Sequence, residues 1–172
     1  MSGMSVRSFE VRLIAVACVA ALIGSPGCIE PRPKGQRIQS VVLLRSATPW
    51  QNLDPVKDEK PEGIQFRMLV YPIEGNKGIL VDGTLHVELY IRETAENGHV
   101  ERTFVDSWTY PMSDLTHTKT PMAIGDFYLV RLGWGNYDLI GREVEFIVSY
   151  VDPDGRKVIA DPLREIVPDR IP

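Results

Sequence analysis

Alternation of apolar and polar side chains with a period of two is the feature that most constrains the fold of this chain. In residues 84–92 every second residue is aliphatic, and the residues between them are polar or aromatic. Residues 143–150 repeat the pattern, with Val, Phe and Tyr on one face and Glu, Ile and Ser on the other. Such a period is typical of β-strands that bury one face in a core. The chain is therefore predicted to form strands whose alternate side chains are hidden from water.

Asp152-Pro153-Asp154-Gly155 follows the second of these strands and has the composition of a tight turn. Asp at the first position bonds the backbone, Pro presets φ at the second, and Gly suits the last. Residues 156–161 are then predicted to return as the second arm of a hairpin. The two aspartates also resemble part of a calcium loop, but Tyr150 would stand where the first carboxylate belongs, so the turn is the preferred interpretation.

Five more strands are predicted from shorter patterns between turn residues. In one of them Phe104, Trp108 and Tyr110 are expected to share a face, although Asp106 interrupts the pattern. No stretch of ten or more residues after the leader keeps a helical apolar period. Seven to eight short strands favour an all-β antiparallel sandwich, with an open barrel as the competing architecture. The predicted strands are 38–45, 64–71, 84–92, 99–110, 127–132, 143–150, 156–161 and 163–167.

Residues 1–27 have the organisation of an export signal. Arg7 and Arg12 precede an apolar run of 11 residues, 13–23, and small residues follow it. A basic start, a short apolar middle and small residues before a cleavage site are typical of a secretory signal peptide. The run is short for a helix that must cross about 30 Å of hydrocarbon, which takes about 20 residues. An uncleaved anchor is the alternative to cleavage.

Cys28 stands directly after this leader, and Cys18 lies inside it, so the mature chain keeps one cysteine. The site resembles the lipobox of bacterial lipoproteins, where a diacylglyceryl group is added to the cysteine and the chain is cut before it. Gly27 fits that pattern, whereas Ser25 and Pro26 depart from it, and an ordinary signal peptidase would cut the same bond and leave a free thiol. Lipidation of Cys28, with the membrane as partner, is the preferred prediction. The predicted organisation is a leader over 1–27, the lipidated Cys and tether over 28–37, a sandwich domain over 38–168 and a tail over 169–172.

The charge of the chain limits the partners it can have. The formal net charge is −4, and removal of residues 1–27 leaves 17 basic and 22 acidic residues. A mildly acidic domain without a basic run offers no electrostatic basis for binding nucleic acid. No nucleic acid partner is therefore predicted.

Few residues could carry chemistry, and the sequence predicts no catalytic residue, no metal site and no cofactor. His86 and Glu88 share the outward face of one strand and could touch one cation, but a zinc site needs three or four ligands. A solvated cross-strand polar pair is the preferred interpretation. His117 lies in the longest unpatterned stretch, 111–126, between Asp114 and Asp126, which leaves a metal-dependent enzyme as a weaker alternative.

Three aromatic residues are candidates for ligand binding. Trp134 and Tyr137 flank Gly135-Asn136 in a predicted loop, and Trp50 lies in another loop. Exposed aromatics in loops can stack on sugar rings, which makes a carbohydrate-binding module one alternative function. The other interpretation is that these side chains close one end of the sandwich core.

Several short motifs carry a resemblance to a known group of proteins. They are Pro61-Glu62-Gly63-Ile64 at the start of a strand, Gly83-Thr84-Leu85 leading to Glu88-Leu89-Tyr90, the later Trp108 and the Asp154-Gly155 hairpin. In these motifs the chain resembles uncharacterised bacterial envelope lipoproteins. The resemblance implies export and an immunoglobulin-like sandwich, and it brings no catalytic residues. Together with lipidation at Cys28, this predicts a location in the bacterial cell envelope, anchored on the periplasmic face. The expected function is a non-catalytic binding or structural module, with assembly through an exposed edge strand as a further possibility.

Overall fold

The computed structural model describes residues 36–53 and 58–171, and this part of the chain is built from β-strands. The leader, Cys28 and most of the predicted tether lie outside the described residues. Within them, no helix has the length and apolarity needed to span a bilayer. The strands are β1 (Ile38–Gln51), β2 (Gly63–Pro72), β3 (Thr84–Thr94), β4 (Val100–Pro111), β5 (Thr116–Thr118), β6 (Phe127–Gly133), β7 (Glu143–Val151), β8 (Lys157–Ile159) and β9 (Leu163–Ile166), with a short 3₁₀ helix, η1 (Met112–Asp114), between β4 and β5.

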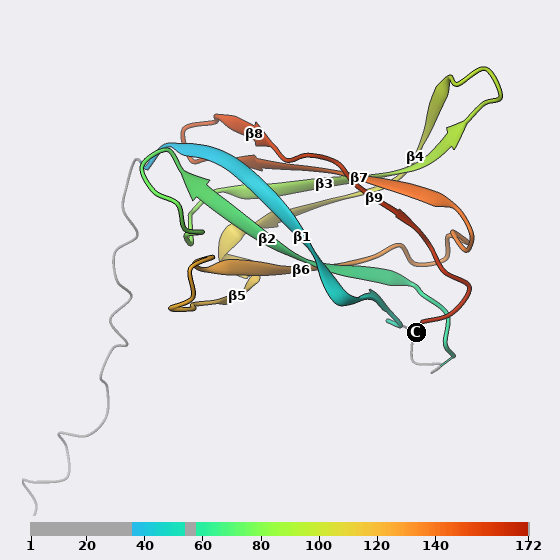
Figure 1. The fold of residues 1–172 in the computed structure, drawn as a ribbon, viewed down its shortest axis with the longest axis horizontal. Helices are drawn as coiled ribbons and strands as arrows, with labels where there is room; N and C mark the ends of the chain where they lie inside the picture. The colour runs from blue at the N-terminus through green and yellow to red at the C-terminus, as the bar shows by residue number, and fades with distance from the viewer. Residues whose placement is uncertain (1–35, 54–57, 172) are drawn as a thin grey trace, which may run out of the picture. The chain divides into compact units, whose positions relative to one another are not determined.

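The strands form two antiparallel sheets (Figure 1). One sheet has the order β1-β2-β6-β5, and the other has the order β4-β3-β7-β8, with β9 also paired to β7. In immunoglobulin nomenclature these orders correspond to A-B-E-D and C′-C-F-G, with β8 and β9 sharing the place of strand G. The predicted immunoglobulin-like β-sandwich is therefore confirmed, and the open barrel is set aside.

The core lies between the two sheets and follows the predicted alternation. Leu85, Val87 and Leu89 of β3 are fully buried, as are the in-phase residues of β7. Phe66 of β2 contacts Phe146 of β7, with ring centroids 6.5 Å apart. These strands correspond to B and F, which a disulfide joins in antibody domains. The described residues contain no cysteine, so they cannot form this disulfide. The Phe66–Phe146 contact connects the two sheets at these strands.

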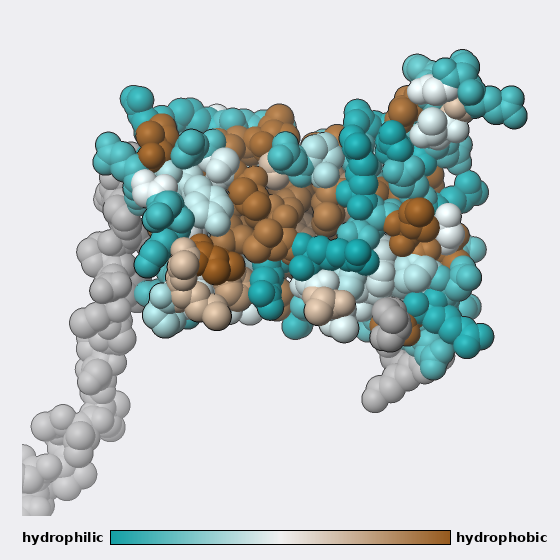
Figure 2. All heavy atoms as spheres, viewed as in Figure 1, coloured by the Kyte–Doolittle hydropathy of each residue, from teal (hydrophilic) through white to brown (hydrophobic). Residues whose placement is uncertain are grey.

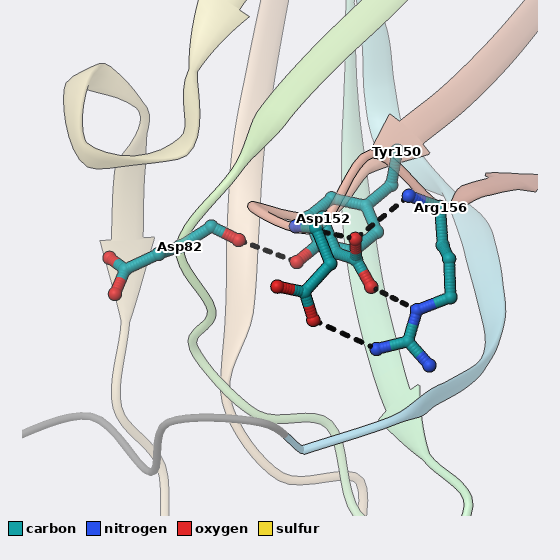
Figure 3. A network of polar contacts seen from close by, with 5 residues as sticks. Asp82, Tyr150, Asp152 and Arg156 are labelled. Atoms are coloured by element: carbon teal, nitrogen blue, oxygen red, sulfur yellow. Dashed lines mark hydrogen bonds and ion pairs between the residues drawn. The ribbon is translucent and has the colours of Figure 1, made fainter.

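The β7–β8 hairpin closes with the predicted turn (Figure 3). Gly155 N donates to Asp152 O at 2.9 Å, and Gly155 has a φ of +83°, which glycine adopts at little cost. Asp152 Oδ1 accepts from the backbone N of Asp154 and of Arg156 at 2.9 and 2.8 Å. Arg156 Nε binds Asp152 Oδ2 at 2.9 Å. The carboxylate of Asp152 is thus used within the turn, as the hairpin interpretation required.

The strand count was wrong because one strand lies in the stretch predicted as loop. The described residues form nine strands rather than seven or eight, and the additional one is β5. Its three residues are all exposed, so they carry no alternation that could reveal them. β1 also runs on to Gln51, beyond the predicted end at residue 45, through a pairing irregularity between Arg45 and Trp50. Such an irregularity shifts the period of two and hides the strand from pattern analysis.

The predicted common face of β4 was also wrong, because β4 contains a bulge. Leu89 pairs with Asp106 but Tyr90 pairs with Phe104, which leaves Val105 as the extra residue. A one-residue insertion moves the following side chains to the other face. Phe104 therefore points outward and is 55% exposed, whereas Trp108 and Tyr110 pack against the core.

Two tyrosine hydroxyls fix the connection between β2 and β3. Tyr128 OH accepts from Val81 N at 2.6 Å and donates to Val81 O at 3.0 Å. Tyr150 OH donates to Asp82 O at 2.5 Å (Figure 3). Burial raises the pKa of Tyr150 to about 12, and the nearby charge of Asp152 adds to the shift. Both hydroxyls bind backbone atoms, so the connection is held in place from the core side.

Candidate functional site

The outward side of the five-stranded sheet, here called the outer face, carries a row of four side chains. Cross-strand register places Phe104 of β4 opposite Tyr90 of β3, Tyr90 opposite Glu145 of β7, and Glu145 opposite Arg164 of β9. The row exists because the period of two directs these residues away from the core, and because the bulge in β4 turns Phe104 to the same side.

Glu145 is the centre of this row and is fully buried although it lies on the outer face. Its carboxylate forms ion pairs with Arg164 Nε, at 2.7 Å, and with Arg102 Nε. The two arginine side chains are 50% and 46% exposed, so they cover the carboxylate from the solvent side. Burial alone would raise the pKa of Glu145, but the hydrogen bonds and charges of both arginines outweigh it and lower that pKa below its usual value.

Further polar contacts fix the side chains next to this centre. Arg92 Nη1 donates to Glu143 Oε1 at 2.7 Å, and Tyr90 OH donates to Glu88 Oε2 at 3.1 Å. The rings of Tyr90 and Phe104 meet edge to face, with centroids 5.7 Å apart. Edge-to-face geometry is a favoured arrangement of aromatic pairs. The contact with Tyr90 orients the Phe104 ring, and more than half of the Phe104 surface is exposed to solvent.

Two exposed aliphatic side chains extend the outer face beyond the row. Ile166 pairs with Glu143 and is 66% exposed, and Ile159 pairs with Ser149 and is 59% exposed. Together with Phe104 and two half-exposed arginines they give the outer face aromatic, aliphatic and guanidinium groups around a buried charge. Aromatic residues and Arg are enriched at protein–protein interfaces, and Tyr and Arg are frequent among residues that dominate binding energy. The outer face thus combines the residue types that are common at protein–protein interfaces.

The histidines predicted as weak metal candidates lie in different sheets. His86 Nδ1 lies 3.0 Å from Thr109 Oγ1 on the outer face, and Glu88 accepts from Tyr90. His117 in β5 has its Nδ1 3.3 Å from Leu115 O and its ring against Tyr128. Across residues 36–53 and 58–171, no three His, Cys, Asp or Glu side chains are grouped so that they could hold a metal ion.

The two acidic residues of the 111–126 stretch form local hydrogen bonds, and Asp126 binds the backbone. Asp126 Oδ1 accepts from Thr120 N at 2.9 Å, and Asp114 Oδ1 accepts from Ser113 Oγ at 2.9 Å. Side-chain bonds of this local kind are typical of turns.

The aromatic candidates divide into two buried residues and one exposed residue. Trp50 and Trp134 are 4% and 2% exposed and pack against each other edge to face, with centroids 6.3 Å apart. For these two, the interpretation that they close one end of the core is confirmed. Tyr137 is 53% exposed, and its role in ligand binding stays a prediction.

Sequence reasoning did not single out Arg102, Phe104, Glu145 or Arg164. The alternation did place Glu145 on the outward face of its strand, but nothing local showed that it is buried. Arg102 and Arg164 lie on β4 and β9, far apart in the chain, and only the register of four strands brings them to one carboxylate. No short motif could have indicated this cluster.

Comparison of the chain with models of known protein families finds no match. Curated proteins and solved structures give no match either. The fold is therefore assigned from the strand order, and the candidate site from its own geometry.

Proposed function

We propose that this chain is an exported, lipid-anchored protein of the bacterial cell envelope, and that its sandwich is a non-catalytic module that binds a protein partner through the outer face. In this proposal Cys28 carries the lipid on the periplasmic side and residues 29–37 form the tether. The carrying observation is the row Phe104–Tyr90–Glu145–Arg164, which presents aromatic and guanidinium groups on one sheet.

The anchor is supported by the leader sequence. A basic start, an apolar run of 11 residues and Gly27 precede the one cysteine that the mature chain keeps. Acyl chains stabilise membrane attachment by about 0.8 kcal/mol per buried CH₂, so two or more chains can hold a small domain without a spanning helix.

The binding role is supported by what surrounds Glu145. Arg102 and Arg164 each contact Glu145 through Nε, and about half of each side chain is exposed to solvent. A guanidinium group carries further donors and can bind a carboxylate through two parallel hydrogen bonds, so these exposed arginines suit an acidic group on a partner. Phe104 beside Arg102 adds apolar area, and a desolvated aromatic can contribute several-fold to affinity.

The carbohydrate-binding alternative has less support. A stacking platform needs exposed aromatic faces, whereas Trp50 and Trp134 are buried against each other. Tyr137 would have to act without them.

The anchor is tested by the mass of the protein recovered from cell envelopes after growth with an alkyne-labelled fatty acid. We expect the chain to begin at Cys28, to carry acyl chains and to take up the label, and Cys28→Ala to abolish labelling. A chain with a free thiol at Cys28, or one that still begins at Met1, would contradict the proposal.

The binding surface is tested by co-purification after chemical cross-linking of intact envelopes. Phe104→Ser and Arg102→Ala should reduce the amount of a bound protein about tenfold, which corresponds to about 1.4 kcal/mol. Leu44→Ser, on the outer side of the other sheet, is the matched control and should retain the partner. Equal loss in the control variant would place the interface elsewhere.

A further inference from the structure

We infer that the end of the sandwich at which β1 begins, here called the tether end, docks on the membrane that holds Cys28. The inference rests on the proposed lipid anchor and goes beyond it, because an anchor alone leaves the orientation of the domain open. It assigns a lipid surface as the partner of two loops.

The length of chain between the anchor and the sandwich limits how far the tether end can move away. Eight residue steps separate Cys28 from Gln36, the first described residue. A chain extends by at most about 3.6 Å per residue, so this segment reaches at most about 29 Å. The domain is therefore kept close to the bilayer by the end at which β1 begins.

Two connections at the tether end lie side by side. Figure 1 shows the start of β1, the β2–β3 connection and the β5–β6 connection at the same end of the sandwich. Ile73 N donates to Arg37 O at 2.9 Å, next to the entry of the tether. Gly78 N donates to Ile124 O at 2.9 Å, and Asp126 N donates to Gly78 O at 2.8 Å, which join the two connections.

These connections expose apolar side chains into solvent. Ile73 is 55% exposed, Met122 is 67% exposed, and Pro121 and Ala123 beside it are exposed as well. In Figure 2, a small group of tan and brown atoms lies at the lower left, where Figure 1 places the β5–β6 connection. The β3–β4 hairpin at the opposite end is mostly teal and white. The apolar loop side chains of this end thus lie where the tether brings the membrane.

The docking loops are held in a fixed conformation before they meet lipid. Tyr128 and Tyr150 bind backbone atoms of Val81 and Asp82 in the β2–β3 connection. A Cβ at Gly125 would lie 2.4 Å from Gly78 N, so the two connections approach too closely for a side chain. Preorganised loops lose little conformational freedom on docking, which favours binding.

Charge does not drive this docking. The tether end, taken as residues 36–37, 72–83, 119–126 and 152–156, holds four cationic and five carboxylate side chains. Anionic lipids therefore gain no net attraction. A few apolar side chains bind a free domain to a membrane only weakly. An anchor within about 29 Å raises the local concentration of lipid at these loops, so that the same weak affinity is enough for docking.

Single reporter positions test the docking, because the lipid occupies the one native thiol of the mature chain. Ile73→Cys and Met122→Cys place a thiol-linked, environment-sensitive fluorophore at the tether end, and Tyr137→Cys, with similar exposure of 53%, is the matched control at the other end. The lipidated mature protein is placed in phosphatidylcholine vesicles with and without doxyl-labelled lipid. We expect blue-shifted emission and doxyl quenching from residues 73 and 122, water-like emission from 137, and no change between about 0.1 M and about 1 M salt.

Several results would overturn the inference. Water-like emission from 73 and 122 on protein that floats with the vesicles would leave the anchor intact but exclude docking. Quenching at 137 would mean the opposite orientation. A concentration-dependent shift without vesicles would mean that a second copy covers these loops. Should Cys28 prove unmodified, the anchor proposal fails separately. A Cys28→Ser variant with an N-terminal polyhistidine tag can then be held on vesicles by a nickel-chelating lipid, which leaves the reporter cysteine as the one thiol, and the same reporters decide whether the tether end docks.

Discussion

Each sheet of this sandwich buries a side chain on its outward side, but the two are covered by different means. Leu69 of the four-stranded sheet is fully buried beneath the β2–β3 connection, and a Cβ built on Gly78 would lie 3.1 Å from its Cδ2. Glu145 of the five-stranded sheet is fully buried beneath the side chains of Arg102 and Arg164.

The difference indicates which side is available to a partner. Backbone hydrogen bonds between Gly78, Ile124 and Asp126 close the cover over Leu69, so that part of its sheet is occupied by the chain itself. Glu145 is covered by long side chains that can change rotamer, and these carry charges that a partner can reach. The part of the four-stranded sheet around Leu69 is thus covered within the fold, whereas the arginine cover of Glu145 is accessible from solvent.

The largest loss of stability is expected at Leu69, the buried apolar side chain. Leu69→Ala should destabilise the protein by about 3 kcal/mol, because it leaves a cavity under a fixed backbone. Leu44→Ala, at a position on the same side that is 38% exposed, should cost less than about 1 kcal/mol. Urea unfolding of both variants measures the comparison, and equal losses would mean that the connection does not shield Leu69.

A smaller loss is expected when the charged cover is removed. The double variant Arg102→Met/Arg164→Met leaves the Glu145 carboxylate without its ion-pair partners. In a site that excludes water, such a change destabilises the folded protein by several kcal/mol. Water can reach Glu145 once the two half-exposed arginines are gone, so we expect the free energy of unfolding to fall by only about 2 kcal/mol at neutral pH. Arg142→Met is the control, since its ion pair with Glu93 is more than half exposed on both sides and should contribute less than about 0.5 kcal/mol. Chemical denaturation that ranks the control above the double variant would contradict the central role of Glu145.

The same cluster predicts a pH dependence of stability. The folded-state pKa of Glu145 is lowered from its ordinary 4.5, so its ionised form stabilises the folded protein above that value. This contribution is lost as the pH falls through the lowered pKa. Below pH 4.5, the free energy of unfolding of Glu145→Gln should therefore fall less steeply with decreasing pH than that of the wild type. Parallel curves for the two proteins would show that Glu145 does not titrate in this way.

The smallest effect on stability is expected at the exposed aromatic. Phe104→Ser should change the free energy of unfolding by about 0.5 kcal/mol, mainly through the lost edge contact with Tyr90. If Phe104→Ser hardly changes stability but abolishes binding of the partner, Phe104 acts in recognition and not in folding. A cost comparable to that of Leu69→Ala would instead make Phe104 a structural residue.

The sequence predicted the sandwich because the chain alternates wherever a strand buries one face. The strands of residues 84–92 and 143–150, and the Asp152–Gly155 turn, carry their signals locally and were predicted correctly. β5 is too short and too exposed to alternate. Phe104 was assigned to the wrong face because a bulge has no reliable signal in one sequence.

The candidate site was harder to predict because it depends on register. Glu145 could be placed on an outward face, but its burial depends on Arg102 and Arg164 from β4 and β9. The ion pairs join strands that become neighbours only after the sheet has formed. For Trp50 and Trp134 the loop positions suggested an exposed stacking platform, whereas the structure packs the two rings against each other in the core.

Site-specific photo-crosslinking in cells that produce the protein tests most directly whether the outer face is the one that a partner contacts. A photoreactive phenylalanine is placed at Phe104 on the outer face, or at Leu44 on the outward side of the four-stranded sheet. We expect a discrete cross-linked species from position 104 and none from position 44. Cross-linking from position 44 alone, or equally from both positions, would contradict it.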